Sequence, residues 1–371
     1  MKIEPFQMER MQSTWENRVE FNLSESGVHP LSLHELLDGD ADRILQDVPL
    51  GYIQSNGTAE LRQKICGLYP GSTINNILVT TGSAEANFLL AWSFIEPGDR
   101  IVYMLPNYMQ TWGLYRAFGA EMHPFYLKEE HGWNPDPEEL KRLISKKTKI
   151  ILVTNPNNPT GAVLSKDIMD LIVKLAGSTG AWIFSDEVYQ GAEKDGKTTP
   201  SFWGRYDKVI VSNGLSKAYG LPGLRTGWIA APSDIIDRTW SYHDYTTISL
   251  STVSDRLARI ALTPDKRNKI LARTRAIINQ NLPVLTSWLD KRKTIFKYIP
   301  PQAGAILYTR YNLEIPSIKF VERLRQDKSV LLVPGDHFEM GKFLRIGFGE
   351  KPGTLQAALD RVENFLATIA E

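Results

Sequence analysis

Short, almost continuously apolar segments recur along the chain and alternate with stretches of helical character. These segments lie at residues 76–80, 100–104, 150–154, 182–189 and 209–211. Strands that are apolar on both faces and alternate with helices are typical of a parallel sheet covered by helices on each side. The sequence therefore predicts an α/β fold with a mostly parallel central sheet.

Further segments indicate a second unit and an N-terminal segment. Helices are expected at 6–18, 33–50, 255–288 and 355–369, and strands of a second unit at 330–335 and 343–348. We predict three parts. Residues 1–45 line the site and join the small domain, residues 46–285 form the large domain, and residues 286–371 form a smaller α+β domain.

Composition narrows the class of protein. The chain has 371 residues with 43 basic and 42 acidic side chains, a net charge of +1, which argues against a nucleic-acid or polybasic membrane partner. No apolar run approaches the roughly 20 residues of a membrane helix, and the first residues lack the apolar core of a signal peptide. A single cysteine, Cys66, excludes an internal disulfide and a cysteine-rich metal site, so no metal is expected. A cytoplasmic location follows as the default expectation.

Residues able to carry chemistry follow the predicted strands. Gly82, Tyr108, Asn158, Asp186 and Lys217 each come at or just after the end of one of them. Ligands of parallel sheets bind at the carboxyl ends of the strands, so these residues are expected to share one site.

The most specific stretch is 212–228. Lys217 stands there among small residues and glycines, and Arg225 follows eight residues later. A lysine forms a Schiff base only when its amine is deprotonated, and glycines allow the backbone to approach a ligand. An arginine can hold a phosphate in a bidentate way. The turn at Gly82 precedes a predicted helix and also suits a phosphate, although such turns are common and Lys217 alone could be a surface lysine.

Taken together, these motifs resemble those of fold-type-I pyridoxal-phosphate (PLP) enzymes of the class I/II aminotransferase group. The resemblance covers nearly the whole chain. It implies that Lys217 forms the Schiff base with the cofactor and that Asp186 pairs with the pyridinium nitrogen. It also implies that Asn158 and Tyr189 bind the phenolic oxygen and that Tyr108 stacks on the ring.

The same resemblance also implies which residues bind the cofactor phosphate and the substrate carboxylate. The phosphate would be bound by Gly82, Ser83, Ala84, Ser216 and Arg225. Tyr52 would reach the phosphate of a neighbouring subunit, which implies a homodimer, and Arg345 would bind the substrate α-carboxylate. Arg345 lies in an apolar strand, where an unpaired arginine is costly, so it needs a partner. Gly214 departs from the pattern, because many relatives have Ser or Thr there.

The N-terminal segment resembles the opening of capreomycidine-synthase-type cyclases, which dehydrate a hydroxyarginine and close its guanidine into a ring. Glu9, Gly27 and His29 match that pattern, whereas Glu25 stands where it has Ser. The chain is similar also to the cyclases that form L-enduracididine from γ-hydroxy-L-arginine in guanitoxin biosynthesis. This implies a PLP-dependent cyclodehydratase; an aminotransferase using a 2-oxo acid and an oxygen-dependent arginine oxidase remain alternatives.

The residues themselves give this reaction limited support. Glu9, Glu16 and Glu25 could bind a cationic side chain, or they could form a solvated acidic face, the favoured interpretation for Glu16. His29 could protonate the leaving hydroxyl or move the β-proton, or it could cap backbone groups. Gly27 and Asn158 are expected near the substrate. The position of the substrate hydroxyl, on Cβ or Cγ, and its stereochemistry stay open.

Overall fold

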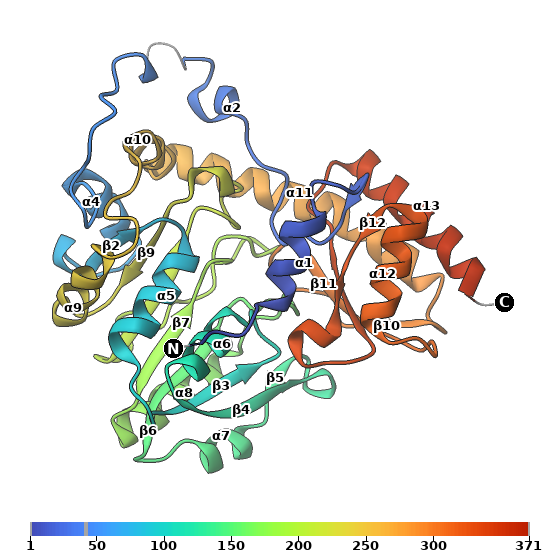
Figure 1. Ribbon diagram of the computed structural model, residues 1–371, viewed down its shortest axis with the longest axis horizontal. Helices are drawn as coiled ribbons and strands as arrows, with labels where there is room; N and C mark the ends of the chain where they lie inside the picture. Colours follow the sequence, from blue (N-terminus) through green and yellow to red (C-terminus); the bar gives the residue numbers. More distant parts are fainter. Residues whose placement is uncertain (1, 41–43, 370–371) are drawn as a thin grey trace.

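The structure, a computed structural model, describes residues 2–40 and 44–369. Its largest element is an eight-stranded sheet in the order β2-β9-β8-β7-β6-β3-β4-β5 (Figure 1). The strands are β2 (Ile77–Thr80), β3 (Arg100–Leu105), β4 (Glu121–Lys128), β5 (Asn134–Pro135), β6 (Thr148–Thr154), β7 (Trp182–Asp186), β8 (Val209–Gly214) and β9 (Gly227–Ala230). Strands β4, β3, β6, β7 and β8 run parallel, and only β2, β9 and β5 join by antiparallel pairing. The predicted α/β fold with a mostly parallel sheet is confirmed.

Helices cover both faces of this sheet because successive strand side chains point to opposite sides. Ile151 and Val153 belong to one apolar cluster, and Ile150 and Leu152 to the other. The first face packs against α4 (Ala59–Cys66), α7 (Pro137–Leu143), α8 (Lys166–Thr179), α10 (Thr252–Ala261) and α11 (Pro264–Asp290). The second packs against α5 (Ser83–Phe94), α6 (Gln110–Ala117) and α9 (Ser233–His243).

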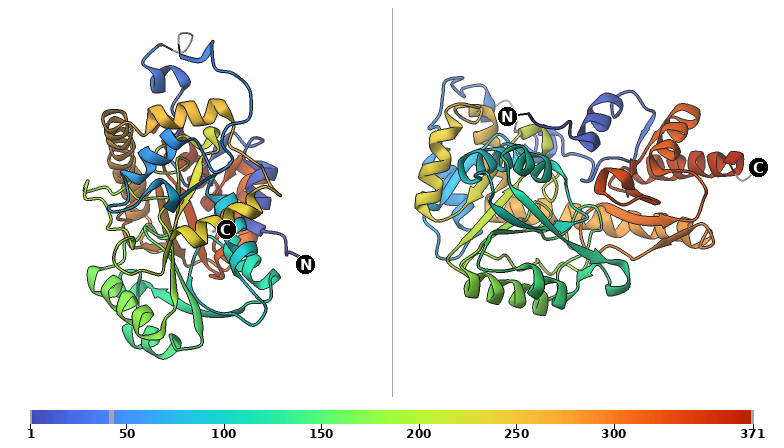
Figure 2. Two further views of the ribbon diagram at one scale, coloured as in Figure 1. Left: turned by 90° about the vertical axis from the view of Figure 1, so that its left-hand side faces the viewer. Right: turned by 60° about the horizontal axis from the view of Figure 1, so that its bottom comes forward.

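The C-terminal part contains an antiparallel sheet in the order β10-β11-β14-β13. Its strands are β10 (Phe296–Tyr298), β11 (Ile306–Tyr311), β13 (Val333–Pro334) and β14 (Phe343–Gly347), accompanied by α12 (Ser317–Lys328) and α13 (Pro352–Ile369). The N-terminal segment joins this part, since β1 (Phe21–Asn22) pairs with β12 (Val330–Leu331). Figure 2 shows α1 (Gln7–Trp15) beside these C-terminal elements.

Two expected helices differ in extent from those of the structure. The helix expected over 33–50 ends early: α2 is Leu33–Leu37, because Asp38 adopts a left-handed conformation with φ of 52°. Residues 41–43 of that range lie outside the described residues. The helix expected over 255–288 is broken between α10 and α11, where Thr263 is extended and Pro264 opens the second helix. Helix α1 is shorter than expected but lies within 6–18.

Two further observations concern the chain as a whole. The predicted domain boundary between residues 285 and 286 falls inside α11, and the three-part division stays a prediction. Across residues 2–40 and 44–369, no helix has both the length and the apolar character to cross a bilayer.

Candidate active site

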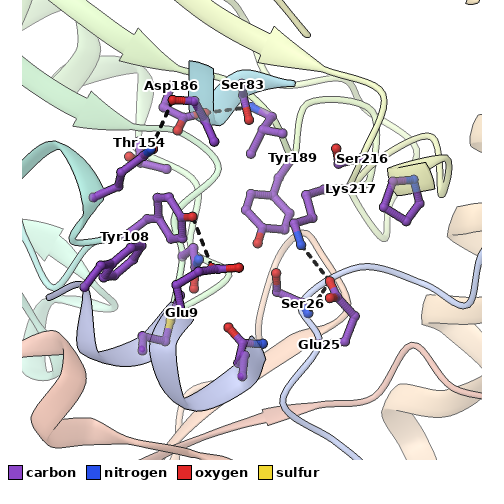
Figure 3. A pocket seen from close by; sticks show the side chains of 18 of the residues that line it. Glu9, Glu25, Ser26, Ser83, Tyr108, Thr154, Asp186, Tyr189, Ser216 and Lys217 are labelled. Atoms are coloured by element: carbon purple, nitrogen blue, oxygen red, sulfur yellow. Dashed lines mark hydrogen bonds and ion pairs between the residues drawn. The ribbon is translucent and has the colours of Figure 1, made fainter. Parts of the chain in front are cut away.

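A cavity of about 470 Å³ lies at the carboxyl ends of the parallel strands (Figure 3). Thr154 ends β6 and Asp186 ends β7, and both line it. Tyr108, Asn158, Tyr189 and Lys217 reach it from the loops after β3, β6, β7 and β8. The strand-end residues predicted to share a site therefore do meet, apart from Gly82, which does not line the cavity although the next two residues do.

Lys217 extends into this cavity from a firmly packed loop. Leu215 and Ala218, on either side of it, are fully buried. Its Nζ donates to Glu25 Oε1 at 2.6 Å, and 25% of the Lys217 side chain and 40% of the Glu25 side chain remain exposed. Burial is the largest single influence on the pKa of Lys217 and lowers it, but the Glu25 carboxylate and Tyr189 together outweigh burial, so the pKa is raised. Burial would raise the pKa of Glu25, yet Lys217 and the N–H groups of Gly27 and Ser26 together lower it to about 2.

Asp186 and Tyr189 are buried polar groups on the same side of the cavity. Asp186 accepts a hydrogen bond from the Val188 N–H at 3.1 Å, and burial raises its pKa to about 6. The Tyr189 hydroxyl has no hydrogen-bond partner among the described residues. A desolvated carboxyl with one donor and an unsatisfied hydroxyl are both suited to a polar aromatic ligand.

The turn between β2 and α5 is shaped by close backbone approach. Gly82 has a φ of 80°, and a Cβ there would lie 2.5 Å from Arg225 Nη2, so the guanidinium packs directly on the turn. A Cβ on Gly227 would lie 2.4 Å from the Ser83 nitrogen. Ser83, Ala84, Ser216 and Arg225 line the cavity at this end. The first N–H groups of α5 and a guanidinium therefore meet, an arrangement that binds phosphate.

Helix α1 closes the opposite side with polar residues at helical spacing. Glu9, Gln12 and Glu16 all line the cavity. Tyr108 Oη donates to Glu9 Oε2 at 3.3 Å, and Gln12 Nε2 donates to the Ser24 carbonyl at 2.8 Å. Burial raises the pKa of Glu16, and the nearby Glu25 and Glu9 carboxylates add to this. Sequence reasoning missed Gln12, although its spacing from Glu9 and Glu16 places all three on one helix face.

Arg345 of β14 is buried and does not itself line the cavity, but it bonds to Asn158, which does. Its Nη1 donates to Asn158 Oδ1 at 2.8 Å, and its Nη2 donates to the Ser24 carbonyl at 2.5 Å. The Nε group has no partner among the described residues. The sequence predicted that this buried arginine would have a partner, and it has two, a side-chain amide and a backbone carbonyl. Both are neutral, so neither contact balances the positive charge of the guanidinium.

The structure does not bring His29 and Tyr52 into the cavity. The Nδ1 atom of His29 accepts from Arg273 Nη2 at 2.9 Å, and the His29 carbonyl accepts from Arg273 Nη1 at 3.0 Å. Burial, followed by Arg273 and Lys351, lowers the pKa of His29. Its predicted acid–base role stays a prediction, which His29→Ala tests: loss of cyclisation with intact cofactor loading would support that role, and cyclisation at the native rate would refute it. The Tyr52 side chain is 87% exposed in this subunit and does not line the cavity.

Gly27 lies against the lysine segment. A Cβ there would meet Glu25 Oε1 and the Ser216 carbonyl at 3.5 Å each, and Lys217 Cδ at 3.7 Å. These are ordinary contact distances, so the N-terminal loop packs directly on the loop that carries Lys217.

The chain matches the family model for aminotransferase class I and II over residues 41–362. It is 28% identical over 353 residues to capreomycidine synthase from Streptomyces vinaceus, covering 94% of this chain and 90% of that one. It superposes on a PLP-dependent aminotransferase from Streptococcus suis with a TM-score of 0.92 and 35% identity, covering 100% and 99% of the two chains. It also superposes on the PLP-dependent cyclase OrfR with a TM-score of 0.91 and 26% identity, covering 99% and 98%.

The chain therefore belongs to the class I and II aminotransferases, a family of PLP-dependent enzymes. The residues present fit this cofactor. The cavity combines an amine, a buried carboxyl, an unsatisfied tyrosine hydroxyl and a turn whose glycine admits a guanidinium. The fold-type-I prediction and the PLP prediction are both confirmed by this membership.

Proposed function

We propose that this enzyme is a PLP-dependent cyclodehydratase that converts a hydroxy-L-arginine, favoured to be γ-hydroxy-L-arginine, into the cyclic guanidino amino acid L-enduracididine. Similarity to capreomycidine synthase and to the cyclase OrfR supports a cyclase. The observation that carries the proposal is the wall of carboxylates opposite the strand ends. Glu9, Glu16 and Glu25 line the same cavity as Lys217 and suit a guanidinium side chain.

The bound cofactor would supply an electron sink that makes loss of the Cα proton possible. Asp186 would hold the ring nitrogen in its charged form, and Tyr189 and Asn158 would bind the phenolic oxygen. Tyr108 would cover the ring face. Lys217, once its amine is free, would take the Cα proton as general base.

The phosphate would sit at the start of α5. The N–H groups of Ser83 and Ala84 point from the helix N-terminus, and Ser216 and Arg225 supply a hydroxyl and a positive charge beside it. Gly82 has no side chain to bind the phosphate, but the absence of a Cβ there lets the Arg225 guanidinium lie against the turn.

The substrate would span the cavity from Asn158, which Arg345 contacts, to α1. Its α-carboxylate would approach Asn158 and the Arg345 guanidinium, whose charge no carboxylate partner neutralises in the contacts described above. Its guanidinium would lie against Glu9 and Gln12. Gly27 would let the N-terminal loop lie close to the reacting carbons.

The dehydration would then use the carboxylates. Loss of a Cβ proton and of the γ-hydroxyl would remove one molecule of water and leave a Cβ–Cγ double bond. A guanidine nitrogen would then add to Cγ and close a five-membered ring, giving up its own proton while a proton returns to Cβ. The proton taken from Cα would return to Cα from Lys217. Glu16 is suited to protonate the departing hydroxyl, because burial and two neighbouring carboxylates raise its pKa. No atom beyond those of the substrate is consumed.

A homodimer would complete the site. Members of this family commonly form homodimers, and Tyr52 is exposed beside Leu50 on the same segment. We infer that Tyr52 reaches the phosphate of the neighbouring subunit. The cytoplasmic location expected from the sequence stays a prediction.

The second candidate is an aminotransferase that uses a 2-oxo acid acceptor. The Streptococcus suis aminotransferase, at 35% identity, favours it. Mass spectrometry of the products from β- and γ-hydroxy-L-arginine, each supplied alone and then with a 2-oxo acid, separates the two. The cyclodehydratase gives a product lighter by one water without an acceptor. A product formed only with the 2-oxo acid would identify an aminotransferase, and peroxide release from L-arginine would identify an oxidase.

A further inference from the structure

The ion pair between Lys217 and Glu25 is a feature that the family chemistry does not account for. Glu25 Oε1 accepts three hydrogen bonds: from Lys217 Nζ at 2.6 Å, from the Ser26 N–H at 2.8 Å and from the Gly27 N–H at 2.9 Å. Two of these donors belong to the backbone of its own loop. The carboxylate is therefore held in place whether or not Lys217 is bound to it.

The loop that carries Glu25 is itself fixed by the C-terminal part of the chain. The Gly347 N–H donates to the Leu23 carbonyl at 2.7 Å, and the His29 N–H donates to the Gly349 carbonyl at 2.8 Å. A Cβ on Gly347 would lie 2.0 Å from the Glu25 carbonyl oxygen, so the two backbones are in direct contact. A negative charge is thus fixed at the end of the lysine side chain by backbone contacts on both sides of Glu25.

We propose that Glu25 is the counter-ion of Lys217 and favours the charged form of its amine whenever that amine is free. Glu25 is then a positioning residue with two opposite effects. It slows the attack of Lys217 on the cofactor aldehyde, because only the neutral amine is a nucleophile. It strengthens Lys217 as a base toward the substrate Cα proton, because the ammonium that forms is stabilised. The pairing concerns the lysine alone and holds whichever amino acid is the substrate.

The other groups that face the lysine do not replace Glu25. Tyr189 favours the charged amine, whereas burial and the Arg345 guanidinium oppose it. Without Glu25 the balance falls toward the neutral amine. A single opposite charge at this distance is worth about one to three pH units.

The charge of Glu25 also acts on two other carboxyl groups. Glu16 and Glu350 are both influenced by its charge, and their own pKa values are raised, first by burial. Glu350 is influenced by the charge of Glu25 but neither lines the cavity nor interacts with Lys217, which makes it the matched control.

The test uses Glu25→Gln, Glu25→Asp and Glu350→Gln as purified apoenzymes. The glutamine keeps an oxygen that can accept the two loop N–H groups, so the loop should stay folded, and thermal melting checks this. The rate of PLP loading is followed by absorbance as a function of pH, with borohydride reduction to confirm the adduct at Lys217. Separately, the PLP-loaded enzymes are given L-arginine in D₂O, and exchange of its Cα hydrogen is followed by NMR.

The proposal expects Glu25→Gln to move the pH midpoint of loading downward by about one unit or more. Loading near neutral pH should become about tenfold faster, while Cα exchange becomes slower. Glu25→Asp should restore the midpoint in part, and Glu350→Gln should leave it within about half a unit of wild type. An unchanged midpoint in folded Glu25→Gln would overturn the proposal. A parallel fall in the rates of PLP loading and of Cα exchange would also overturn it, because Glu25 would then only maintain the structure of the site. The pH dependence of loading does not depend on whether the enzyme cyclises its substrate. Failure of the proposed function and failure of the proposed role of Glu25 can therefore be distinguished.

Discussion

Gly227→Ala tests whether the turn before α5 binds the cofactor phosphate. Gly227 begins β9, and a Cβ there would lie 2.4 Å from the Gly82 carbonyl carbon and the Ser83 nitrogen. Ordinary contact begins near 3.4 Å, so the turn must move by about 1 Å. The clashing atoms are backbone on both sides, and no flexible side chain can move aside to relieve the clash.

The displacement has a calculable effect on binding. A shift of about 1 Å takes an N–H donor out of the usual hydrogen-bond range. A hydrogen bond to a charged group is worth about 1.5–3 kcal/mol, so loss of two weakens PLP by about a hundredfold or more. Overpacking should also lower stability by about 1–3 kcal/mol.

The assay compares PLP with pyridoxal, which lacks the phosphate, by absorbance titration of the apoenzyme. The affinity for PLP should fall while that for pyridoxal changes little. Gly223→Ala is the matched control from the same segment, because a Cβ there meets nothing within 4 Å. If folded Gly227→Ala binds PLP as tightly as wild type, the phosphate does not sit at this turn.

Three further substitutions test other parts of the site and the fold. Asp186→Asn removes the buried carboxyl, so it should lower turnover on the order of 100-fold with a smaller loss of PLP affinity, measured by steady-state kinetics and titration; equal losses would contradict the assigned role. Arg345→Lys keeps the charge but loses the planar fork, so the KM for the amino acid should rise by about tenfold while PLP loading is unchanged. Glu85 has a pKa lowered to about 2, against burial, by hydrogen bonds from His243, Thr246 and the Thr81 N–H. Because its folded pKa lies below its ordinary value, its stabilisation, on the order of 3 kcal/mol, is present above about pH 4.5 and is lost as the pH falls toward 2. The difference in Tm between wild type and Glu85→Gln should close over that window, and a difference independent of pH would show that the charge is not involved.

The sheet and the strand-end residues could be predicted from the sequence because they depend on local pattern. Apolar runs identified β3, β6, β7 and β8, and the carboxyl-end rule then located Asp186 and Lys217 without any knowledge of distant contacts. Where local pattern misled, a single residue decided the outcome. Asp38 turns left-handed and stops α2, and Pro264 starts a new helix inside a stretch that looked continuous.

The contacts between distant segments could not be predicted, because no local signal encodes them. Glu25 and Lys217 are 192 positions apart, and His29 and Arg273 are 244 apart. The sequence indicated that Glu25 and His29 stand near the reaction, but not that one binds the lysine and the other an arginine outside the cavity. Gln12 is different, since its spacing on α1 could have identified it.

The most direct measurement of the proposed activity counts turnovers of γ-hydroxy-L-arginine per active site, with no 2-oxo acid present and oxygen excluded. A cyclodehydratase regenerates its starting form at the end of each cycle, so many equivalents of cyclic product should accumulate for each enzyme subunit. An aminotransferase without an acceptor stops after one half-reaction, and conversion of no more than one equivalent per subunit would contradict the cyclodehydratase.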